Sequence, residues 1–444
     1  MRSSLPKVLH PLAGRPLLEH VIHTARQLQA DSIYVVYGYG GNAVPQALTH
    51  LTVNWVEQAE QLGTGHAVDQ AMPSVADGDT VLVLYGDVPL ISMTTLQRLI
   101  AAVSDSSLGL LTVHQHDPQG YGRIVRDAGK RVTRIVEEKD ATAEERSIGE
   151  INTGMIAAPA ARMRSWLAKL GNNNAQKEYY LTDVIALAVQ EGVMINTVAP
   201  DKVAETMGIN NKAQLAELER YYQRQEAERL MLEGVTLLDP LRLDVRGELS
   251  VGQDVTLDIN IVFEGKVTLG NRVRIGPHVV IRNARIGDDV EILSHCVIED
   301  AAIESGCRIG PFARIRPETQ LAAGVHIGNF VEIKKSSVGV GSKINHLSYI
   351  GDATVGREVN IGAGTITCNY DGANKHQTVI EDGAFIGSDT QLVAPVTVGA
   401  HATIGAGSTI TQNVPPQVLA VSRVEQSTVP GWKRPVKSDK KDKS

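Results

Sequence analysis

The segment 330–349 brings acidic, basic and imidazole side chains close together along the chain. His346 is a candidate general base, because a neutral imidazole accepts a proton near pH 7. Taken by itself, a histidine in such a segment is more often a surface residue than a base. Arg316 precedes Lys334 by 18 residues, so in a coil of about 18 residues both cations share one face. Two stacked cations suit a phosphate group.

A polar loop follows this segment at 367–375, with the sequence TCNYDGANK. It interrupts a run of regularly spaced aliphatic residues and contains the pair Asn369 and Tyr370. Loops that project from a rigid scaffold are where binding groups usually sit. The loop and the two cations together favour the interpretation that His346 belongs to a functional site.

The N-terminal half contains further candidates, each of them weak alone. Residues 58–66 (QAEQLGTGH) look like a strand end followed by a Gly-rich turn that opens a helix, where backbone N–H groups can hold an anion or a base edge. Asp87 follows an apolar run that ends in Tyr85 and Gly86, a position suited to Mg²⁺. A Gly turn before a helix is most often only structural, and the polar junctions 121–123 and 150–154 are uninformative individually.

The candidate residues of the N-terminal half lie among strand-like and helix-like segments that alternate over residues 1–210. Short β-branched runs at 32–37 and 80–85 predict buried strands, and 17–29 and 65–72 predict helices. This alternation predicts an α/β, doubly wound parallel sheet. Ligands of such sheets bind beyond the carboxyl ends of the strands, where Asp87 lies. The segment 211–233 has no Gly or Pro and predicts one long helix, closed by Gly234, that links two domains.

After Gly234 an aliphatic residue followed by glycine recurs, often at intervals of 6, 12 or 18 residues. This spacing predicts a parallel β-helix of hexapeptide repeats, in which each aliphatic side chain points into a narrow core. The pairs begin at Val251, Leu269, Ile275, Ile286, Ile309, Ile327, Val338, Ile350, Val355, Ile361, Ile386, Val398 and Ile404. Coils expose their sheet edges until they stack, so the repeats must form one continuous solenoid.

Composition excludes several classes of protein. The formal net charge of −7 gives no reason to expect nucleic-acid binding, and no apolar run is long enough to predict a membrane span or a signal peptide. Three cysteines without a CxxC pair fit the reducing cytoplasm and argue against structural zinc. The basic run 433–443 is typical of a solubilising tail.

Several motifs agree on one family. The blocks are LPKVLHPLAG (5–14), EQLGTGHA (60–67), LYGDVPL (84–90), GYGRI (120–124), EINTG (150–154), NNNAQKEYYLTD (172–183), GPFARIRP (310–317), NFVEIKK (329–335) and NIGAGTITCNYDGANKH (360–376). From residue 1 to about 437 the chain resembles the bacterial bifunctional N-acetylglucosamine-1-phosphate uridyltransferases and glucosamine-1-phosphate acetyltransferases. The resemblance implies a homotrimeric left-handed β-helix with an acetyl-transfer site between subunits.

The resemblance also implies roles for individual residues. His346 would accept the proton of the sugar 2-amine. The sugar phosphate would be held by Arg316, Lys334, Tyr349 and Asn360. Acetyl-CoA would be held by Ala363, Asn369, Tyr370, Ser388, Ala406 and Arg423, with Lys375 nearby. The uridine nucleotide (UTP) would be held by Lys7, Gln58, Gly63, Thr64, Tyr85, Gly86, Asp87, Gly122, Glu137, Asn152 and Asn210. Asp87 and Asn210 would bind Mg²⁺, which neutralises phosphate charge during uridylyl transfer.

The chain departs from the family pattern at its beginning. The family starts with a strand and a Gly-rich loop that ends Gly-x-Gly-Thr-Arg-Met, and Met1 matches the final Met. We hypothesise a mis-called start codon and expect negligible uridylyl transfer if the chain exists as printed. Losing a strand from such a sheet would leave unpaired backbone groups.

The resulting expectations are specific. Residues 1–211 form the uridyltransferase domain, 212–234 a linker helix, 235–425 the left-handed β-helix acetyltransferase domain and 426–444 a basic tail. One rival is a β-helical carbonic anhydrase, which needs two zinc-binding histidines five residues apart, whereas Gly351 stands at that distance from His346. The other rival is a non-catalytic β-helix scaffold or sugar-nucleotide binding protein, which a failure to bind acetyl-CoA would favour.

Overall fold

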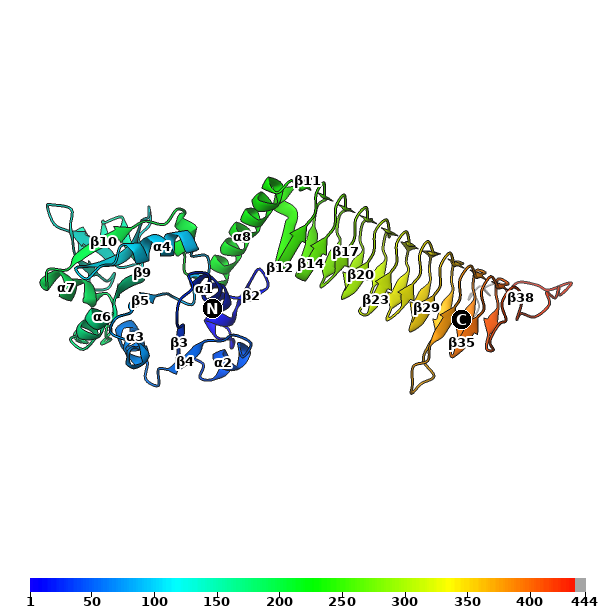
Figure 1. Ribbon diagram of the computed structural model, residues 1–444, viewed down its shortest axis with the longest axis horizontal. Coiled ribbons are helices and arrows are strands. Elements are labelled where there is room, and N and C mark those ends of the chain that lie inside the picture. Colours follow the sequence, from blue (N-terminus) through cyan, green and yellow to red (C-terminus); the bar gives the residue numbers. More distant parts are fainter. Residues whose placement is uncertain (436–444) are drawn as a thin grey trace, which may run out of the picture. The chain divides into compact units, whose positions relative to one another are not determined.

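The computed structural model describes residues 1–435 and divides into two compact units. One unit comprises Met1–Arg229 with Val245–Gly247, and the other comprises Leu230–Asp244 with the chain from Glu248 onward. Figure 1 shows helices around a sheet in the first and a stack of short strands in the second. Residues 436–444 of the tail expected at 426–444 lie outside the described residues.

The first unit alternates helices and strands, as the sequence predicts. Its strands are β1 (Pro11–Leu12), β2 (Arg15–Pro16), β3 (Tyr34–Tyr37), β4 (Asn54–Glu57), β5 (Thr80–Val83), β6 (Ser107–His114), β7 (Arg123–Arg126), β8 (Val132–Val136), β9 (Glu150–Pro159) and β10 (Met194–Val198). Its helices are α1 (Leu17–Gln27), α2 (Ala43–Ala47), α3 (Thr64–Ala71), α4 (Met93–Ala101), α5 (Ala143–Arg146), α6 (Ala160–Leu167), α7 (Asp183–Gln190) and α8 (Lys212–Leu232). The strands and helices predicted from the apolar runs are confirmed, with slightly shorter ends.

The main sheet of this unit differs from the parallel sheet that we expected. Its order is β10-β6-β9-β7-β8, and β5 also pairs with β9. β10 runs parallel to β6, but β9 runs antiparallel to β5, β6 and β7. The reason is the connection from β6 to β9. It holds the β7–β8 hairpin and the short α5 instead of a long crossover helix, which a parallel return requires.

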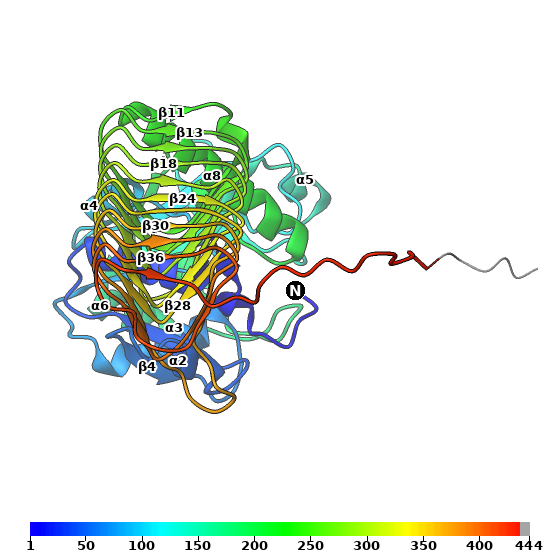
Figure 2. The ribbon, with the colours of Figure 1, turned by 90° about the vertical axis from the view of Figure 1, so that its right-hand side faces the viewer.

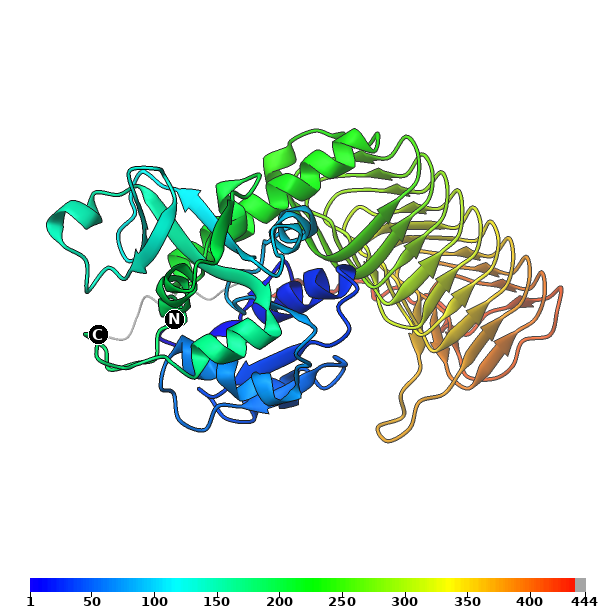
Figure 3. The same ribbon diagram turned by 60° about the vertical axis from the view of Figure 1, so that its left-hand side comes forward.

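β3 and β4 form a separate two-stranded parallel sheet. Val35 of β3 packs with Leu18 and Ile22 of α1 and with Val44 of α2 in one apolar cluster. A larger cluster lies under the main sheet, where Trp166 of α6 is fully buried. Figure 3 shows these helices packed around the sheets. The first unit therefore has a core of its own, and the carboxyl end of β5 leads to Asp87.

α8 confirms the long helix predicted at 211–233. The helix ends where Gly234 adopts a φ of 98°, a conformation that glycine takes without strain. The N–H of Gly234 donates to the carbonyl of Met231 at 3.1 Å, which caps the last turn.

The second unit is a left-handed parallel β-helix, built from two long sheets of stacked short strands. The 11-stranded sheet runs β11 (Thr236–Leu237), β13 (Thr256–Leu257), β15 (Arg274–Ile275), β18 (Glu291–Ile292), β21 (Arg308–Ile309), β24 (His326–Asn329), β27 (Lys343–His346), β30 (Asn360–Ile361), β33 (Phe385–Ile386), β36 (Thr403–Ile404) and β38 (Leu419–Ala420). Figure 2 shows the coils stacked over one another.

The 17-stranded sheet covers the other faces of the coils. Its strands are β12 (Leu243–Val251), β14 (Ile261–Leu269), β16 (Val280–Arg282), β17 (Arg285–Ile286), β19 (Val297–Glu299), β20 (Ala301–Ile303), β22 (Arg314–Ile315), β23 (Thr319–Leu321), β25 (Glu332–Lys334), β26 (Ser337–Val338), β28 (Tyr349–Gly351), β29 (Ala353–Val355), β31 (Ile366–Cys368), β32 (Thr378–Ile380), β34 (Gln391–Val393), β35 (Val396–Val398) and β37 (Thr409–Ile410).

The hexad aliphatics line the core of this β-helix. Apart from the half-buried Val251, every aliphatic residue of the predicted pairs is buried. The glycines after them allow coils to approach closely. A Cβ on Gly362 would lie 2.5 Å from the amide nitrogen of Ser388, which is too close for any larger residue without movement. The coil register is therefore set by apolar burial inside and by glycine at the corners.

One loop leaves the coils, between β31 and β32. It corresponds to the polar interruption that the sequence shows, and it projects from the solenoid in Figures 1 and 3. Tyr370 and Lys375 form an isolated antiparallel bridge that closes it into a narrow hairpin. In the part of the chain that the structure describes, no helix is long and apolar enough to cross a membrane.

Candidate functional site

Three residues predicted for the nucleotide site meet around one ammonium group. Nζ of Lys7 lies 2.5 Å from Oδ2 of Asp87 and 2.9 Å from Oδ1 of Asn210. The N–H of Ile209 donates to the carbonyl of Asp87 at 3.0 Å, which ties the two oxygen-bearing segments together. A carboxylate oxygen and an amide oxygen that converge on a cation are donors that Mg²⁺ accepts, so these residues fit a magnesium ion.

Tyr85 and Glu137 add two acidic side chains, each with a raised pKa, beside Asp87. Burial, together with the nearby carboxylates of Glu137 and Asp87, raises the pKa of Tyr85 to about 12. Burial also raises the pKa of Glu137, whose Oε1 accepts a hydrogen bond from Oγ1 of Thr182 at 3.0 Å. A Cβ on Gly122 would lie 3.3 Å from the same Oε1, so glycine keeps this space open.

The turn before α3 holds the next predicted residues. Nε2 of Gln58 donates to the carbonyl of Gly63 at 3.1 Å and lies 3.0 Å from Nδ1 of His66. Gly63 has a φ of 115°, which a larger residue rarely adopts. Oγ1 of Thr64 accepts from the N–H of Leu181 at 3.1 Å. The turn is therefore held rigidly on both sides.

Asn152 and Gly86 complete the set. The N–H of Asn152 donates to the carbonyl of Gly122 at 2.8 Å, and its Oδ1 accepts from the N–H of Gly154 at 3.0 Å. A Cβ on Gly154 would lie 2.5 Å from the ring of Tyr85, so the ring packs directly on this backbone. A Cβ on Gly86 would meet Val8 at 3.3 Å.

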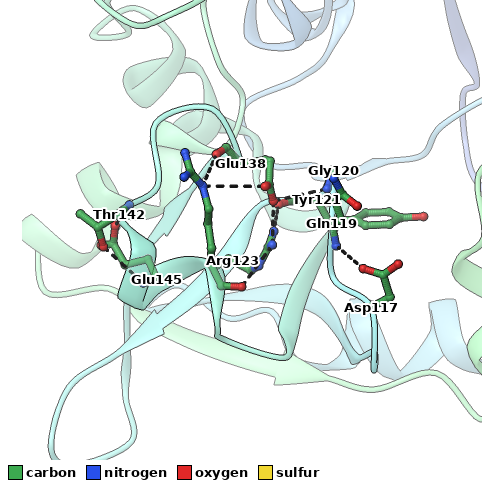
Figure 4. Close-up of polar contacts among 9 residues, drawn as sticks. Asp117, Gln119, Gly120, Tyr121, Arg123, Glu138, Thr142 and Glu145 are labelled. Carbon is green, nitrogen blue, oxygen red and sulfur yellow. Dashed lines mark hydrogen bonds and ion pairs between the residues drawn. The ribbon is translucent and has the colours of Figure 1, made fainter.

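Sequence reasoning missed the device that holds the Gly122 loop, which Figure 4 shows. Arg123 is buried, and its Nη2 lies 2.6 Å from Oε2 of Glu138 while its Nη1 donates to the carbonyl of Tyr121. The same Oε2 accepts from the N–H of Gly120 at 3.3 Å. The ion pair thereby holds the backbone of Gly120 and Tyr121, which directly precede Gly122. Burial and the Asp87 carboxylate raise the pKa of Tyr121, which places this loop near Asp87.

In the β-helix, Arg316 and Lys334 lie at equivalent positions of adjacent coils. Ile315 pairs with Ile333 in parallel register, so the two following residues share a face, as their spacing predicts. The close Lys375 ammonium lowers the pKa of Lys334, and Arg316 adds to the effect. Three cations that repel one another are well placed to bind a dianionic phosphate.

Two carboxylates frame these cations. Nη1 of Arg316 lies 2.7 Å from Oε1 of Glu332, which orients the guanidinium. Nδ2 of Asn369 donates to Oδ2 of Asp352 at 2.5 Å and lies 3.5 Å from the hydroxyl of Tyr349. Tyr349 and Asn369 are therefore neighbours, although the resemblance assigns them to different substrates.

The projecting loop is held by its own hydrogen bonds. Asp371 accepts from the N–H groups of Asn374 and Ala373 at 2.7 and 2.8 Å, and its Oδ2 lies 2.7 Å from Nε2 of His376. These contacts, led by the Asn374 N–H, hold the pKa of Asp371 well below its usual range. Tyr370 remains 61% exposed, so its ring is available to a ligand.

A column of one residue per coil begins at His346. Ile344, Ile361, Ile386 and Ile404 pair in register along β27, β30, β33 and β36. The residues two positions later are therefore His346, Ala363, Ser388 and Ala406. Neighbouring strands lie about 4.8 Å apart, so these small side chains form an extended strip that ends at the imidazole. Nη1 of Arg423 donates to the carbonyl of Ala406 at 2.7 Å, at the far end of the strip.

Asn360, which is predicted to bind the sugar phosphate, lies on a different sheet from Lys334 and Tyr349. Asn360 belongs to β30 of the 11-stranded sheet, in register with Lys343 and Phe385. Lys334 and Tyr349 belong to the 17-stranded sheet. Sequence reasoning also missed Asn329, whose Oδ1 lies 2.9 Å from Nδ1 of His346. The 17-residue interval between the two, about one coil, was the available signal.

Comparisons with known proteins agree with this division. The family model "MobA-like NTP transferase domain" matches residues 1–233, and "Bacterial transferase hexapeptide (six repeats)" matches residues 249–283 and 377–412.

Full-length relatives are more specific. A protein of Aromatoleum aromaticum with the name "Bifunctional protein GlmU" is 61% identical over 437 residues, which covers 98% of this chain and 96% of the relative. Proteins of the same name from an Azoarcus species and from Methylococcus capsulatus are 60% and 58% identical, and cover 98% and 99% of this chain and 97% and 96% of the relatives. The chain therefore belongs to the bifunctional GlmU family of transferases, which combine nucleotidyltransferase and acetyltransferase activity.

Proposed function

We propose that this chain acetylates glucosamine-1-phosphate with acetyl-CoA and then transfers uridylyl from UTP to the product, which gives UDP-N-acetylglucosamine and diphosphate. Residues 235–425 would carry the first reaction and residues 1–211 the second. The observation that carries the proposal is the strip of small residues that leads to His346, close in sequence to a three-cation cluster. Family membership supports both reactions, which are early steps toward cell-wall polysaccharide.

The acetyl-transfer site divides the work among its residues. Arg316, Lys334 and Lys375 bind the phosphate of the sugar, with Tyr349 and Asn360 beside it. Acetyl-CoA lies along Ala363, Ser388 and Ala406, where small side chains leave room, and it contacts Asn369, Tyr370 and Arg423. The thioester then reaches the imidazole at the end of the strip.

The chemistry at this site needs one proton transfer. His346 takes a proton from the 2-amine as the nitrogen attacks the thioester carbonyl. The amine must be neutral to attack, and its nitrogen must then lose a proton to give the amide. The C–S bond breaks, and the thiolate of CoA leaves with a proton that the imidazolium can return. The product is N-acetylglucosamine-1-phosphate.

The nucleotide site acts chiefly by holding the nucleotide in place and by neutralising the negative charge of its phosphates. The uridine nucleotide would be lined by Gln58, Gly63, Thr64, Tyr85, Gly86, Gly122, Glu137 and Asn152. Asp87 and Asn210 would hold Mg²⁺, which supplies neutralisation of the phosphate oxygens when bound. Lys7 adds a positive charge beside both ligands, at 2.5 Å and 2.9 Å.

A homotrimer is the proposed assembly. The acetyl-transfer residues of one chain occupy two sheets, and Asn360 stands apart from Lys334 and Tyr349. On the coil of His346 and the two coils before it, Leu347, Phe330 and Phe312 are 62%, 55% and 47% exposed. Exposed apolar side chains in a row favour burial against another subunit. Three free cysteines support a location in the reducing cytoplasm.

The test is product formation from simple substrates. The chain is incubated with glucosamine-1-phosphate, acetyl-CoA, UTP and Mg²⁺, and mass spectrometry follows both sugar products. We expect N-acetylglucosamine-1-phosphate without UTP and UDP-N-acetylglucosamine with it, and neither without acetyl-CoA. Because membership of a bifunctional family supports both activities, this expectation replaces the negligible uridylyl transfer expected from the sequence alone. Acetyl-CoA that fails to bind the folded protein would favour the non-catalytic scaffold instead.

A further inference from the structure

His346 shares a hydrogen bond with a residue that no role above includes. Nδ1 of His346 lies 2.9 Å from Oδ1 of Asn329. Asn329 ends β24 and His346 ends β27, and the two residues are paired in parallel register on adjacent coils. Side chains at paired positions of parallel strands point the same way, so the contact follows directly from the coil geometry.

The backbone around the pair is held firmly. Oγ of Ser348 donates to the carbonyl of His346 at 2.8 Å, and the N–H of Leu347 donates to the carbonyl of Asn329 at 3.1 Å. A Cβ on Gly328 would lie 1.9 Å from the carbonyl oxygen of Asn345, so glycine lets the two coils meet here. Among residues 1–435 the structure gives Nε2 of His346 no hydrogen-bond partner.

We propose that Asn329 is a positioning residue, which fixes the tautomer and the ring orientation of His346 for acetyl transfer. A neutral imidazole has one N–H donor and one acceptor nitrogen. When the amide oxygen of Asn329 accepts from Nδ1–H, the lone pair stands on Nε2 of the exposed His346 side chain. This inference rests on the proposed role of His346 as the base.

The opposite arrangement would not support the reaction. If the amide nitrogen of Asn329 donated to Nδ1, the imidazole proton would lie on Nε2, and Nε2 could not accept the amine proton. The correct arrangement keeps Nδ1–H bonded both before and after proton transfer, because the imidazolium donates from both nitrogens. The amide thus orients the ring through the whole step, and a neutral side chain suffices for this task.

Substitution of Asn329 separates positioning from binding. Asn329→Asp keeps an oxygen that can only accept, whereas Asn329→Leu keeps a similar volume without a hydrogen bond. We expect kcat of Asn329→Leu to fall roughly 10- to 100-fold, with KM for both substrates nearly unchanged, because orientation of a general base contributes rate and not affinity. We expect Asn329→Asp to stay within about threefold of the parent kcat.

The matched control is Ser294→Leu. Ser294 occupies the same corner position two coils earlier, since Ile292, Ile309 and Ile327 pair in register. This control should keep the parent kcat. Full activity of Asn329→Leu, or an equal loss in Asn329→Asp and Asn329→Leu, would overturn the proposal.

A spectroscopic measurement tests the tautomer without any turnover. Solid-state ¹⁵N NMR of histidine-labelled protein, with His346→Gln to assign the signal, reports which ring nitrogen carries the proton. We expect protonated Nδ1 and bare Nε2 in the neutral parent protein, and a proton on Nε2 would refute the proposal. If Asn329→Leu does not fold, this readout and Asn329→Asp still decide. Loss of the base role would show separately, as unchanged turnover in His346→Ala.

Discussion

Asn369 donates to the carboxylate of Asp352 across a distance of 2.5 Å, and this bond fastens the projecting loop to the coil before it. The same amide nitrogen lies 3.5 Å from the hydroxyl of Tyr349. Asp352 also lies near the lysine pair, because its negative charge opposes the lowering of the pKa of Lys334 by Lys375 and adds to the effect of Lys334 in raising the pKa of Lys375. One carboxylate thus organises residues proposed for both substrates.

Asp352→Ala should therefore weaken binding of both substrates of acetyl transfer. Loss of a hydrogen bond to a charged group costs about 1.5–3 kcal/mol, so we expect KM for acetyl-CoA and glucosamine-1-phosphate each to rise by roughly 10-fold or more. Steady-state kinetics measures both values. Asp289→Ala, which removes a surface partner of Arg272, is the control and should change neither. A rise in only one KM would show that the two substrate sites are not joined through Asp352.

Arg316→Ala should impair the sugar phosphate alone. The guanidinium is one of three cations proposed for the phosphate, and we expect KM for glucosamine-1-phosphate to rise by about 10- to 100-fold. KM for acetyl-CoA should stay within about twofold. Arg285→Ala removes another arginine of the same β-helix, paired with Glu304, and should leave both values unchanged. An unchanged KM in Arg316→Ala would remove this residue from the site.

Asp371 should control the projecting loop in a pH-dependent way. Its pKa is lowered, first by the Asn374 N–H, so its stabilising contact is complete above the ordinary value of about 3.9 and is lost as the pH falls below it. At pH 7 the contact is fully present. Asp371→Ala should thus raise hydrogen exchange of the peptide 369–377 and raise KM for acetyl-CoA about 3- to 10-fold at pH 7. Equal exchange in both proteins would show that other contacts order the loop.

Arg123→Met should destabilise the first unit. Arg123 is 2% exposed and Glu138 is 28% exposed, so removal of the buried cation leaves the Glu138 carboxylate without its ion-pair partner and should lower the midpoint of thermal unfolding. The control is Arg131→Met, because Arg131 is 85% exposed in its pair with Asp127 and should change the midpoint much less. Thermal unfolding followed by calorimetry measures both. Similar midpoints for the two variants would contradict a structural role for the buried pair.

The sequence predicts the β-helix well because each repeat carries its own signal. An aliphatic residue that must be buried and a glycine that must turn recur within every coil, so Ile309 and Ile327 identify their strands without reference to distant residues. Arg316 and Lys334 follow from the same period. The long helix α8 is likewise a local property, since helix propensity and the Gly234 cap act within a few residues.

The remaining features depend on contacts that no local pattern encodes. The direction of β9 is decided by the hairpin that precedes it, although its buried residues look the same in either direction. From the sequence, Arg123 would be expected on the surface, and its burial depends on the ion pair with Glu138. Asn329 contacts His346 only because the coils stack in one register, which places the amide oxygen of Asn329 next to Nδ1 of His346. These are pairings across the fold, and they set the chemistry of both sites.

The most direct measurement is release of free CoA from acetyl-CoA in the presence of glucosamine-1-phosphate, for the folded parent protein and for His346→Ala. A general base contributes about 10²- to 10⁴-fold to such a step, so we predict turnover in the parent and a loss of at least about 100-fold in His346→Ala. Equal turnover in both proteins would contradict the role of His346, and no turnover in the folded parent would contradict acetyl transfer itself.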